Sequence, residues 1–234
     1  MTSSTRGKRY LTELLGTFTL VTVGCGSAMV ASRTHAFGHT AIALAFGLVV
    51  TMVVAAAGHL SGAHVNPAVT IGFWSIRRFP ASDVVPYVAA QCIGAILGSL
   101  FLAWTLGNIA NMGGTVPSIP VAQAFAVEMG FSGVLAFVIM SVATDERTTP
   151  SLAPFVIGAT VFAGALVTGP ITGGSFNPAR SLGPSVVSGD WTVHWLYWGA
   201  PVIGMVLAMR LYDLLRGADA TTPHTPLGVE GPID

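Results

Sequence analysis

Six long apolar stretches alternate with short polar segments along the chain. A helix that crosses about 30 Å of hydrocarbon needs roughly 20 mostly apolar residues, so each stretch predicts one membrane-spanning helix. The pattern therefore predicts an all-α membrane protein with six transmembrane helices, at approximately residues 10–32, 39–58, 84–106, 121–144, 152–169 and 194–215.

Two further apolar pieces, at about 66–76 and 177–187, are much shorter. A helix rises about 1.5 Å per residue, so neither piece is long enough to cross a bilayer. We expect each to enter the membrane as a re-entrant half-helix that reaches only the middle.

The composition agrees with a chain that lies mostly in a lipid bilayer. Of the 234 residues, 52% are hydrophobic and 9% are charged, against roughly 25% charged in an ordinary soluble domain. The formal net charge is zero and the basic residues are scattered, so no nucleic-acid partner is implied. Cys25 and Cys92 lie in apolar stretches without a metal-ligand spacing, so neither a metal nor a cofactor is implied.

The basic residues predict how the chain is oriented, because cytoplasmic loops carry an excess of Lys and Arg. With the N-terminus inside, eight of the ten basic residues are cytoplasmic, namely Arg6, Lys8, Arg9, Arg77, Arg78, Arg147, Arg210 and Arg216. Arg33 is then outside and Arg180 lies on the second short piece. We expect both termini in the cytoplasm.

Each short piece follows a copy of one sequence. Residues 58–68 read Gly-His-Leu-Ser-Gly-Ala-His-Val-Asn-Pro-Ala and residues 169–179 read Gly-Pro-Ile-Thr-Gly-Gly-Ser-Phe-Asn-Pro-Ala, with five of eleven positions identical at an offset of 111. Glu13 and Glu128 recur at the similar offset of 115. Because three predicted spans separate the copies, the two halves must have opposite orientations, as in an inverted repeat.

This duplication predicts how the chain is divided. We expect one membrane domain over residues 1–216, with repeat halves at about 8–106 and 121–216. The segment 217–234 is rich in Thr, Pro and Gly, and we expect it to be a disordered tail.

The Asn-Pro-Ala sequences mark helix starts. Asn is a favoured N-cap and Pro is favoured at the first helical position, so the half-helices begin at Asn66-Pro67-Ala68 and Asn177-Pro178-Ala179. The preceding segments 59–65 and 170–176 are then extended backbone at membrane depth, which is tolerated where carbonyls line a wet cavity. The expected pore-lining backbone is at His59, Ser61, Gly62, Ala63, His64, Gly173 and Ser175.

Two opposed half-helices would form a barrier to cations. Each helix N-terminus carries roughly half a positive charge, and the inverted repeat brings both termini to the midplane. The side-chain oxygen of a capping Asn bonds its own helix, so we expect the amide N–H groups of Asn66 and Asn177 to donate into the lumen.

With this pair of motifs, the chain resembles the aquaporin (major intrinsic protein) family over about residues 8–216. The resemblance implies a bundle of six tilted helices, a homotetramer with one pore per subunit, and a location in a bacterial inner membrane. It also implies a constriction in which Arg180 repels cations, with Phe46, Ala165 and Gly174 as the other filter residues. The implied function is a passive channel, not an enzyme, for water and small neutral solutes.

The solute range stays open. Water-selective members usually have His at the position of Ala165, so this constriction is expected to be wider and less polar. Ser181 and the pair Tyr197-Trp198 instead resemble the water-conducting branch. The run 173–184 is similar to plant nodulin-type channels associated with neutral metalloid acids. Water is predicted first, with glycerol or the acid forms of arsenite and borate as the wider alternative.

The carboxylates Glu13 and Glu128 allow two interpretations. Intramembrane carboxylates often relay protons, which would make the chain a proton-coupled transporter. In the family they instead support the carbonyl segments through bonds to backbone N–H groups. For His59 and His64, an intramembrane hydrolase would need a nearby carboxylate and nucleophile, and none is apparent. The resemblance to the family implies instead that these histidines shape the cytoplasmic mouth.

Overall fold

The computed structural model describes residues 3–217, and within them the secondary structure is helical without a strand. The tail was predicted over 217–234, and apart from Gly217 it lies outside the described residues. Eight α-helices follow one another: α1 (Ser3–Thr34), α2 (His39–Ser61), α3 (Pro67–Ser75), α4 (Ala81–Leu106), α5 (Val121–Thr144), α6 (Ala153–Thr172), α7 (Pro178–Ser188) and α8 (Leu196–Arg216). Two 3-10 turns, η1 (Ala110–Gly113) and η2 (Pro150–Leu152), lie in the connections.

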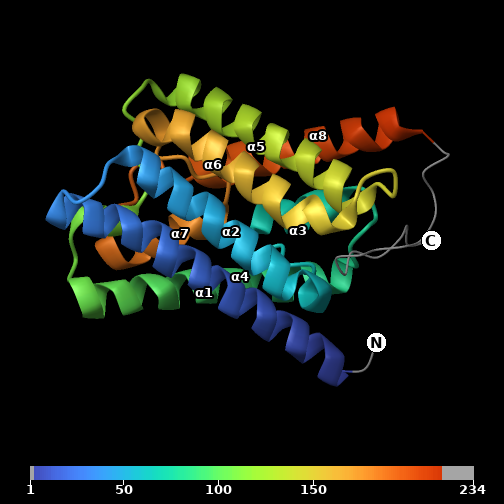
Figure 1. Cartoon of the computed structure of the whole chain (residues 1–234), viewed down its shortest axis with the longest axis horizontal. Coiled ribbons are helices and arrows are strands. Elements are labelled where there is room, and N and C mark those ends of the chain that lie inside the picture. Colours follow the sequence, from blue (N-terminus) through green and yellow to red (C-terminus); the bar gives the residue numbers. More distant parts are fainter. Residues whose placement is uncertain (1–2, 218–234) are drawn as a thin grey trace.

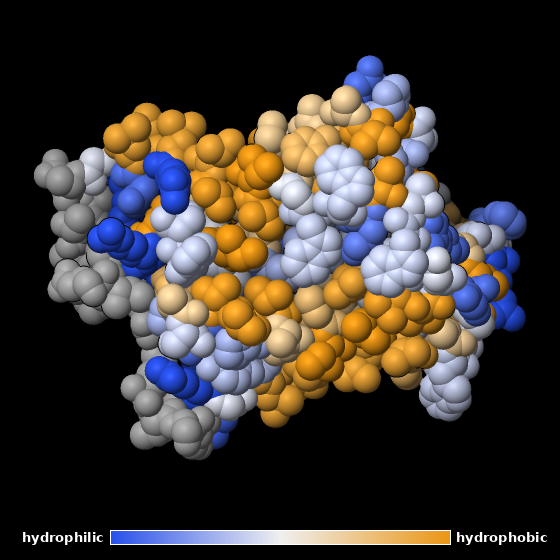
Figure 2. Space-filling model, turned by 180° about the vertical axis from the view of Figure 1, so that it is seen from behind, coloured by the Kyte–Doolittle hydropathy of each residue, from blue (hydrophilic) through white to orange (hydrophobic). Residues whose placement is uncertain are grey.

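Six of these helices are long and apolar enough to span a membrane, namely α1, α2, α4, α5, α6 and α8. The two remaining helices, α3 with 9 residues and α7 with 11, are too short to cross. The prediction of six spans and two half-helices is confirmed. Figure 2 shows the consequence on one face, where apolar side chains cover much of the flank and most hydrophilic residues lie toward the two ends.

The duplication is visible in how the long helices pair. The most extensive packing joins α1 with α4 and, in the second half, α5 with α8. Small residues allow both contacts, because a Cβ added at Gly94 would lie 2.2 Å from the carbonyl oxygen of Leu14, and one at Gly204 would lie 2.1 Å from that of Met129. The halves are joined where α2 packs on α6. The inverted repeat is thus present in the packing as well as in the sequence.

The start of α1 and the end of α8 lie at the same end of the molecule (Figure 1), which we call the inner end; the opposite end is the outer end. The inner end carries ion pairs between Arg9 and Asp83 and between Arg78 and Asp213. Most of the basic residues outside the spans therefore gather at one end, as the orientation argument requires.

Two helices run further than the hydropathy pattern predicts. The sequence places the extended segments from residues 59 and 170, but α2 continues to Ser61 and α6 to Thr172. Each ends where a glycine takes up left-handed backbone, Gly62 at φ 90° and Gly173 at φ 86°, with its N–H bonded to the carbonyl four residues earlier. The non-helical segments are therefore only 62–66 and 173–177.

Candidate pore and its filter

The two half-helices begin at the asparagines. The side-chain oxygen of Asn66 accepts from the N–H of Ala68 at 2.9 Å, and that of Asn177 accepts from the N–H of Ala179 at 3.0 Å. Both asparagines have extended backbone and are followed by proline at the first helical position. Local sequence therefore determines where each half-helix starts, as capping predicts.

The asparagines also join the two halves of the repeat. The amide nitrogen of Asn66 donates to the carbonyl of Phe176 at 2.8 Å, and that of Asn177 donates to the carbonyl of Val65 at 2.8 Å. An amide nitrogen carries two N–H groups, so one of each pair is used across the repeat and one is left. The predicted donation into the lumen is therefore limited to one N–H group of each asparagine.

Glu13 holds the first extended segment in place. One carboxylate oxygen accepts from the Ser61 hydroxyl at 2.7 Å and the His64 N–H at 3.0 Å. The other oxygen accepts from the Val65 N–H at 2.7 Å and the Gln91 amide at 2.8 Å. These four bonds use the acceptor positions of both oxygens. The side chain is fully buried, so it acts as a fixed acceptor for backbone that has no helical partner.

Glu128 repeats this arrangement in the second half. It accepts from the Thr172 hydroxyl at 2.6 Å, from the Ser175 N–H at 3.0 Å and from the Phe176 N–H at 2.9 Å. In the first half, Gln91 donates a side-chain amide to Glu13; none of the three donors to Glu128 in the described residues is a side-chain amide. The first carboxylate therefore carries one more donor than the second.

Two tyrosines that the sequence analysis did not assign to these segments complete the support. The hydroxyl of Tyr87 donates to the carbonyl of Ser61 at 2.8 Å, and that of Tyr197 donates to the carbonyl of Thr172 at 2.6 Å. They fall at nearly the same offset as the motifs, which is the sequence signal that would have found them. Tyr197 thus satisfies a carbonyl at the end of α6.

The predicted filter residues come together near the outer end of the path. The guanidinium carbon of Arg180 lies 4.7 Å from the centroid of the Phe46 ring. One terminal nitrogen of Arg180 donates to the carbonyl of Gly113 at 2.8 Å and lies 3.4 Å from the sulfur of Cys25. Gly113 and Cys25 were not predicted to take part, since only the fold brings η1 and α1 to α7.

Two cavities meet at this filter. An outer cavity of about 250 Å³ is lined by Ala165, Gly173 and Gly174, and an inner cavity of about 70 Å³ is lined by Gly62, Ala63, His64, Asn66, Ser175 and Asn177. Phe46 and Arg180 line both cavities. These two residues therefore lie at the boundary between the two cavities, as a filter between an outer and an inner cavity requires.

Two predicted pore residues lie elsewhere. His59 is an exposed residue of α2 and lines neither cavity, because the helix continues past it. Ser61 is buried and its hydroxyl donates to Glu13. His64 does line the inner cavity and stacks on Phe73 with ring centroids 5.1 Å apart. Among residues 3–217, no three His, Cys, Asp or Glu residues form a group able to hold a metal ion.

A six-helix membrane bundle with two half-helices that meet at capping asparagines defines a membrane channel. The chain belongs to the major intrinsic protein family, whose family model matches residues 1–212. It is 41% identical to Nodulin-26 of Glycine max over 221 residues, 93% of this chain and 81% of that protein. It is 40% identical to Aquaporin NIP1-1 of Zea mays over 211 residues, 89% of this chain and 75% of that protein.

A solved structure agrees with this assignment. The aquaglyceroporin from Plasmodium falciparum superposes with a TM-score of 0.80 at 29% identity, covering 89% of this chain and 96% of that one. Members of the family are membrane channels for water and small solutes and not enzymes, and this chain is such a channel. These relatives come from plants and Plasmodium, so they give no support to the predicted bacterial inner membrane.

Proposed function

We propose that the chain conducts water and small neutral hydroxylated solutes such as glycerol, and excludes protons and other ions. The outer cavity carries this proposal. Of the four predicted filter residues, Phe46 and Arg180 have large side chains, while Ala165 and Gly174, which line the same cavity, are small. A solute larger than water therefore meets less side chain there than it would in a filter with four large residues.

The exclusion of cations rests on charge. Arg180 brings a buried guanidinium to the boundary between the two cavities, and the N-termini of α3 and α7 bring partial positive charges to the asparagines. The remaining amide N–H of Asn66 and of Asn177 can donate to a water oxygen, which then cannot readily accept a proton from its neighbour. An arginine and the positive ends of half-helix dipoles are the established proton and cation barriers of aquaporin-type pores.

A proton-coupled transporter is the competing proposal. It would need a carboxylate that takes up and releases a proton along the path. The acceptor positions of Glu13 are all used by donors that support the backbone, which favours the passive channel.

The same proposal includes an assembly and an orientation. We place the inner end in the cytoplasm, with one domain over residues 1–216 and halves at about 8–106 and 121–216, and expect a homotetramer with one path per subunit. The basic residues at the inner end support the orientation.

The test is stopped-flow light scattering of proteoliposomes under a sucrose gradient and then a glycerol gradient, with a pH-sensitive dye inside. We expect fast shrinkage in sucrose, reswelling in glycerol, and no proton leak above that of empty liposomes. Shrinkage without reswelling, in glycerol and in boric or arsenious acid alike, would restrict the channel to water. Vesicles no faster than empty ones would overturn the proposal.

A further inference from the structure

One imidazole lines the outer cavity beside the filter. His39 is the first residue of α2 and is half-buried. Thirteen residues of the described chain line this cavity, and His39 and Arg180 are the two among them with polar side chains. The chemistry that side chains offer a solute here is therefore limited to an imidazole and a guanidinium.

Pro170 leaves free the backbone carbonyl that orients the imidazole. A proline has no backbone N–H, so Pro170 inside α6 cannot bond the carbonyl of Leu166 four residues earlier. The Nε2 atom of His39 lies 3.0 Å from that carbonyl oxygen. Because a carbonyl only accepts, Nε2 must carry the hydrogen, and in a neutral ring Nδ1 is then an acceptor.

Gly169 provides the space for the ring. A Cβ added there would lie 2.3 Å from Cε1 of His39 and 3.0 Å from Nε2. The position has no left-handed backbone that would itself call for glycine, since Gly169 is absent from the residues with positive φ. Sequence and fold thus agree in leaving room for an imidazole from α2 next to the filter.

We propose that His39 is a specificity-determining residue for small neutral hydroxylated solutes. Its Nδ1 accepts a hydrogen bond from a solute hydroxyl group, while the guanidinium of Arg180, which can only donate, bonds a solute oxygen. A hydroxyl group both donates and accepts, so a polyol satisfies both partners at once. This inference rests on the proposed function, because it assumes that such solutes enter the outer cavity.

The experiment compares three variants with the wild type in proteoliposomes, using glycerol as the probe. His39→Leu removes both nitrogens at similar size. His39→Gln keeps an N–H for the Leu166 carbonyl and an acceptor oxygen. His35→Asn removes an exposed histidine of the same connection, at a left-handed position that asparagine tolerates. The ratio of glycerol to water permeability is measured for each, so that water flow reports how much folded channel is present.

We expect His39→Leu to lower this ratio about fivefold, the effect of one lost hydrogen bond, His39→Gln to keep most of it, and His35→Asn to leave it unchanged. A ratio that His39→Leu leaves at the wild-type value would overturn the inference, and so would an equal loss in His39→Gln. A wild type that passes water but no glycerol would also overturn it. A wild type that passes neither would instead refute the proposed channel, which keeps the two failures apart.

Discussion

Arg180 donates a hydrogen bond of 2.8 Å to the backbone carbonyl of Gly113, so the connection between α4 and α5 holds the filter arginine. The carbon of the same guanidinium lies 4.7 Å from the centroid of the Phe46 ring. Residues from η1, α2 and α7 therefore meet at one point of the path. Any change to this contact alters the constriction without touching the asparagines.

Arg180→Val is expected to make the channel leak protons and to pass glycerol faster. The substitution removes the buried positive charge and widens the contact with Phe46. A barrier lower by about 1.4 kcal/mol would raise a rate about tenfold. Dye-loaded proteoliposomes measure the proton leak, and stopped-flow scattering measures glycerol entry. A tight variant with unchanged glycerol flow would contradict the assigned role of Arg180.

Gly113→Ala should give a weaker form of the same defect while the charge is kept. Gly113 has φ 65°, and a Cβ there would lie 2.7 Å from the carbonyl oxygen of Cys25. The backbone must move, and the carbonyl that holds Arg180 moves with it. Gly107→Ala is the matched control, because Gly107 also has positive φ, at 83°, but no atom lies near its added Cβ. If Gly107→Ala changed the glycerol-to-water ratio as much as Gly113→Ala, strain at a positive φ, and not the shift of the Gly113 carbonyl, would explain the change.

The spans, the half-helices and the asparagine caps could be predicted from the sequence because these depend on local pattern. Apolar length and the Asn-Pro start are readable residue by residue. Gly113, Cys25 and Gln91 were missed because their roles exist only after distant helices pack. The ends of α2 and α6 were misplaced because apolar character stops before the helix does, and only the glycines Gly62 and Gly173 mark the true ends. The pattern of residues along the chain does not predict the contacts between separate helices.

Glu13→Gln should destabilise the protein more than Glu128→Gln. A glutamine puts an N–H group where the carboxylate accepted, and each buried donor left without an acceptor costs about 1–3 kcal/mol. Glu13 accepts four bonds and Glu128 three. At roughly 2–4 °C per kcal/mol for a chain of this size, we expect Tm in detergent to fall by about 4 °C or more for Glu13→Gln.

The same variant tests the transporter alternative. In vesicles with a pH gradient, neither the wild type nor Glu13→Gln should accumulate solute above its external concentration. Accumulation above the external concentration in the wild type, lost in Glu13→Gln at unchanged Tm, would favour coupled transport.

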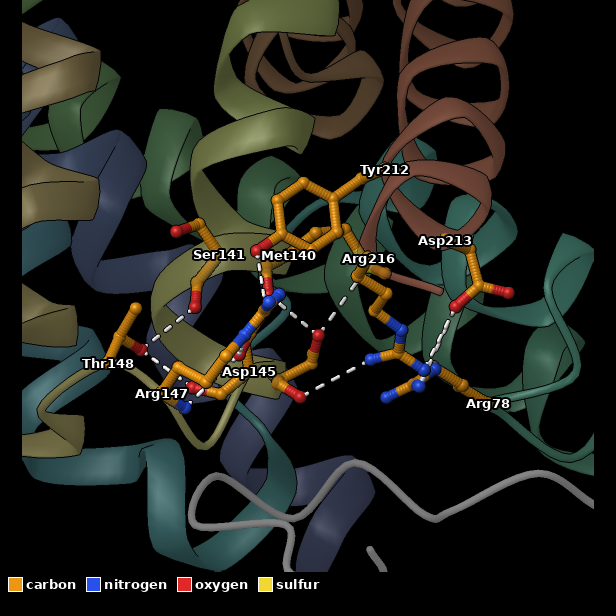
Figure 3. A network of polar contacts seen from close by, with 10 residues as sticks. Arg78, Met140, Ser141, Asp145, Arg147, Thr148, Tyr212, Asp213 and Arg216 are labelled. Atoms are coloured by element: carbon orange, nitrogen blue, oxygen red, sulfur yellow. Dashed lines mark hydrogen bonds and ion pairs between the residues drawn. The ribbon is translucent and has the colours of Figure 1, made fainter. Parts of the chain in front are cut away.

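Asp145→Asn should lower Tm near neutral pH and lower it less at pH 3. Hydrogen bonds from the Arg147 side chain, and a further one from the Tyr212 hydroxyl at 2.8 Å, hold the pKa of Asp145 well below its usual range (Figure 3). A lowered carboxyl pKa adds stability that is present above the unfolded value of about 3.9 and is lost as pH falls through the folded value.

The measurement is Tm of the wild type and of Asp145→Asn at pH 7 and pH 3. We expect a difference of a few °C at pH 7, from about 1–3 kcal/mol for a lost charged acceptor, and a smaller one at pH 3. Tyr212→Phe should lose part of the difference, since it removes one of the donors. A gap between wild type and Asp145→Asn that is as large at pH 3 as at pH 7 would show that the carboxylate charge is not involved.

His194 should make stability pH-dependent in a separate window at the outer end. Burial lowers the pKa of His194, which precedes α8. Its Nε2 accepts from the indole N–H of Trp198 at 3.2 Å, and its Nδ1 lies 3.1 Å from the Ser185 hydroxyl. An indole N–H only donates, so Nε2 must stay unprotonated for this bond. Stability is therefore highest above the unfolded pKa of about 6.5 and falls as pH drops below it toward the folded value.

Between pH 7.5 and pH 5, wild-type Tm should fall by about 2–4 °C more than that of His194→Gln, corresponding to about 1 kcal/mol for the broken bond. Trp198→Phe removes the indole N–H whose hydrogen bond is lost when His194 is protonated, so the Tm of this variant should also depend less on pH. Because this window lies above that of Asp145, a single pH series of Tm resolves the two groups. Parallel pH curves for the wild type and both variants would mean that His194 is held by packing rather than by its neutral form.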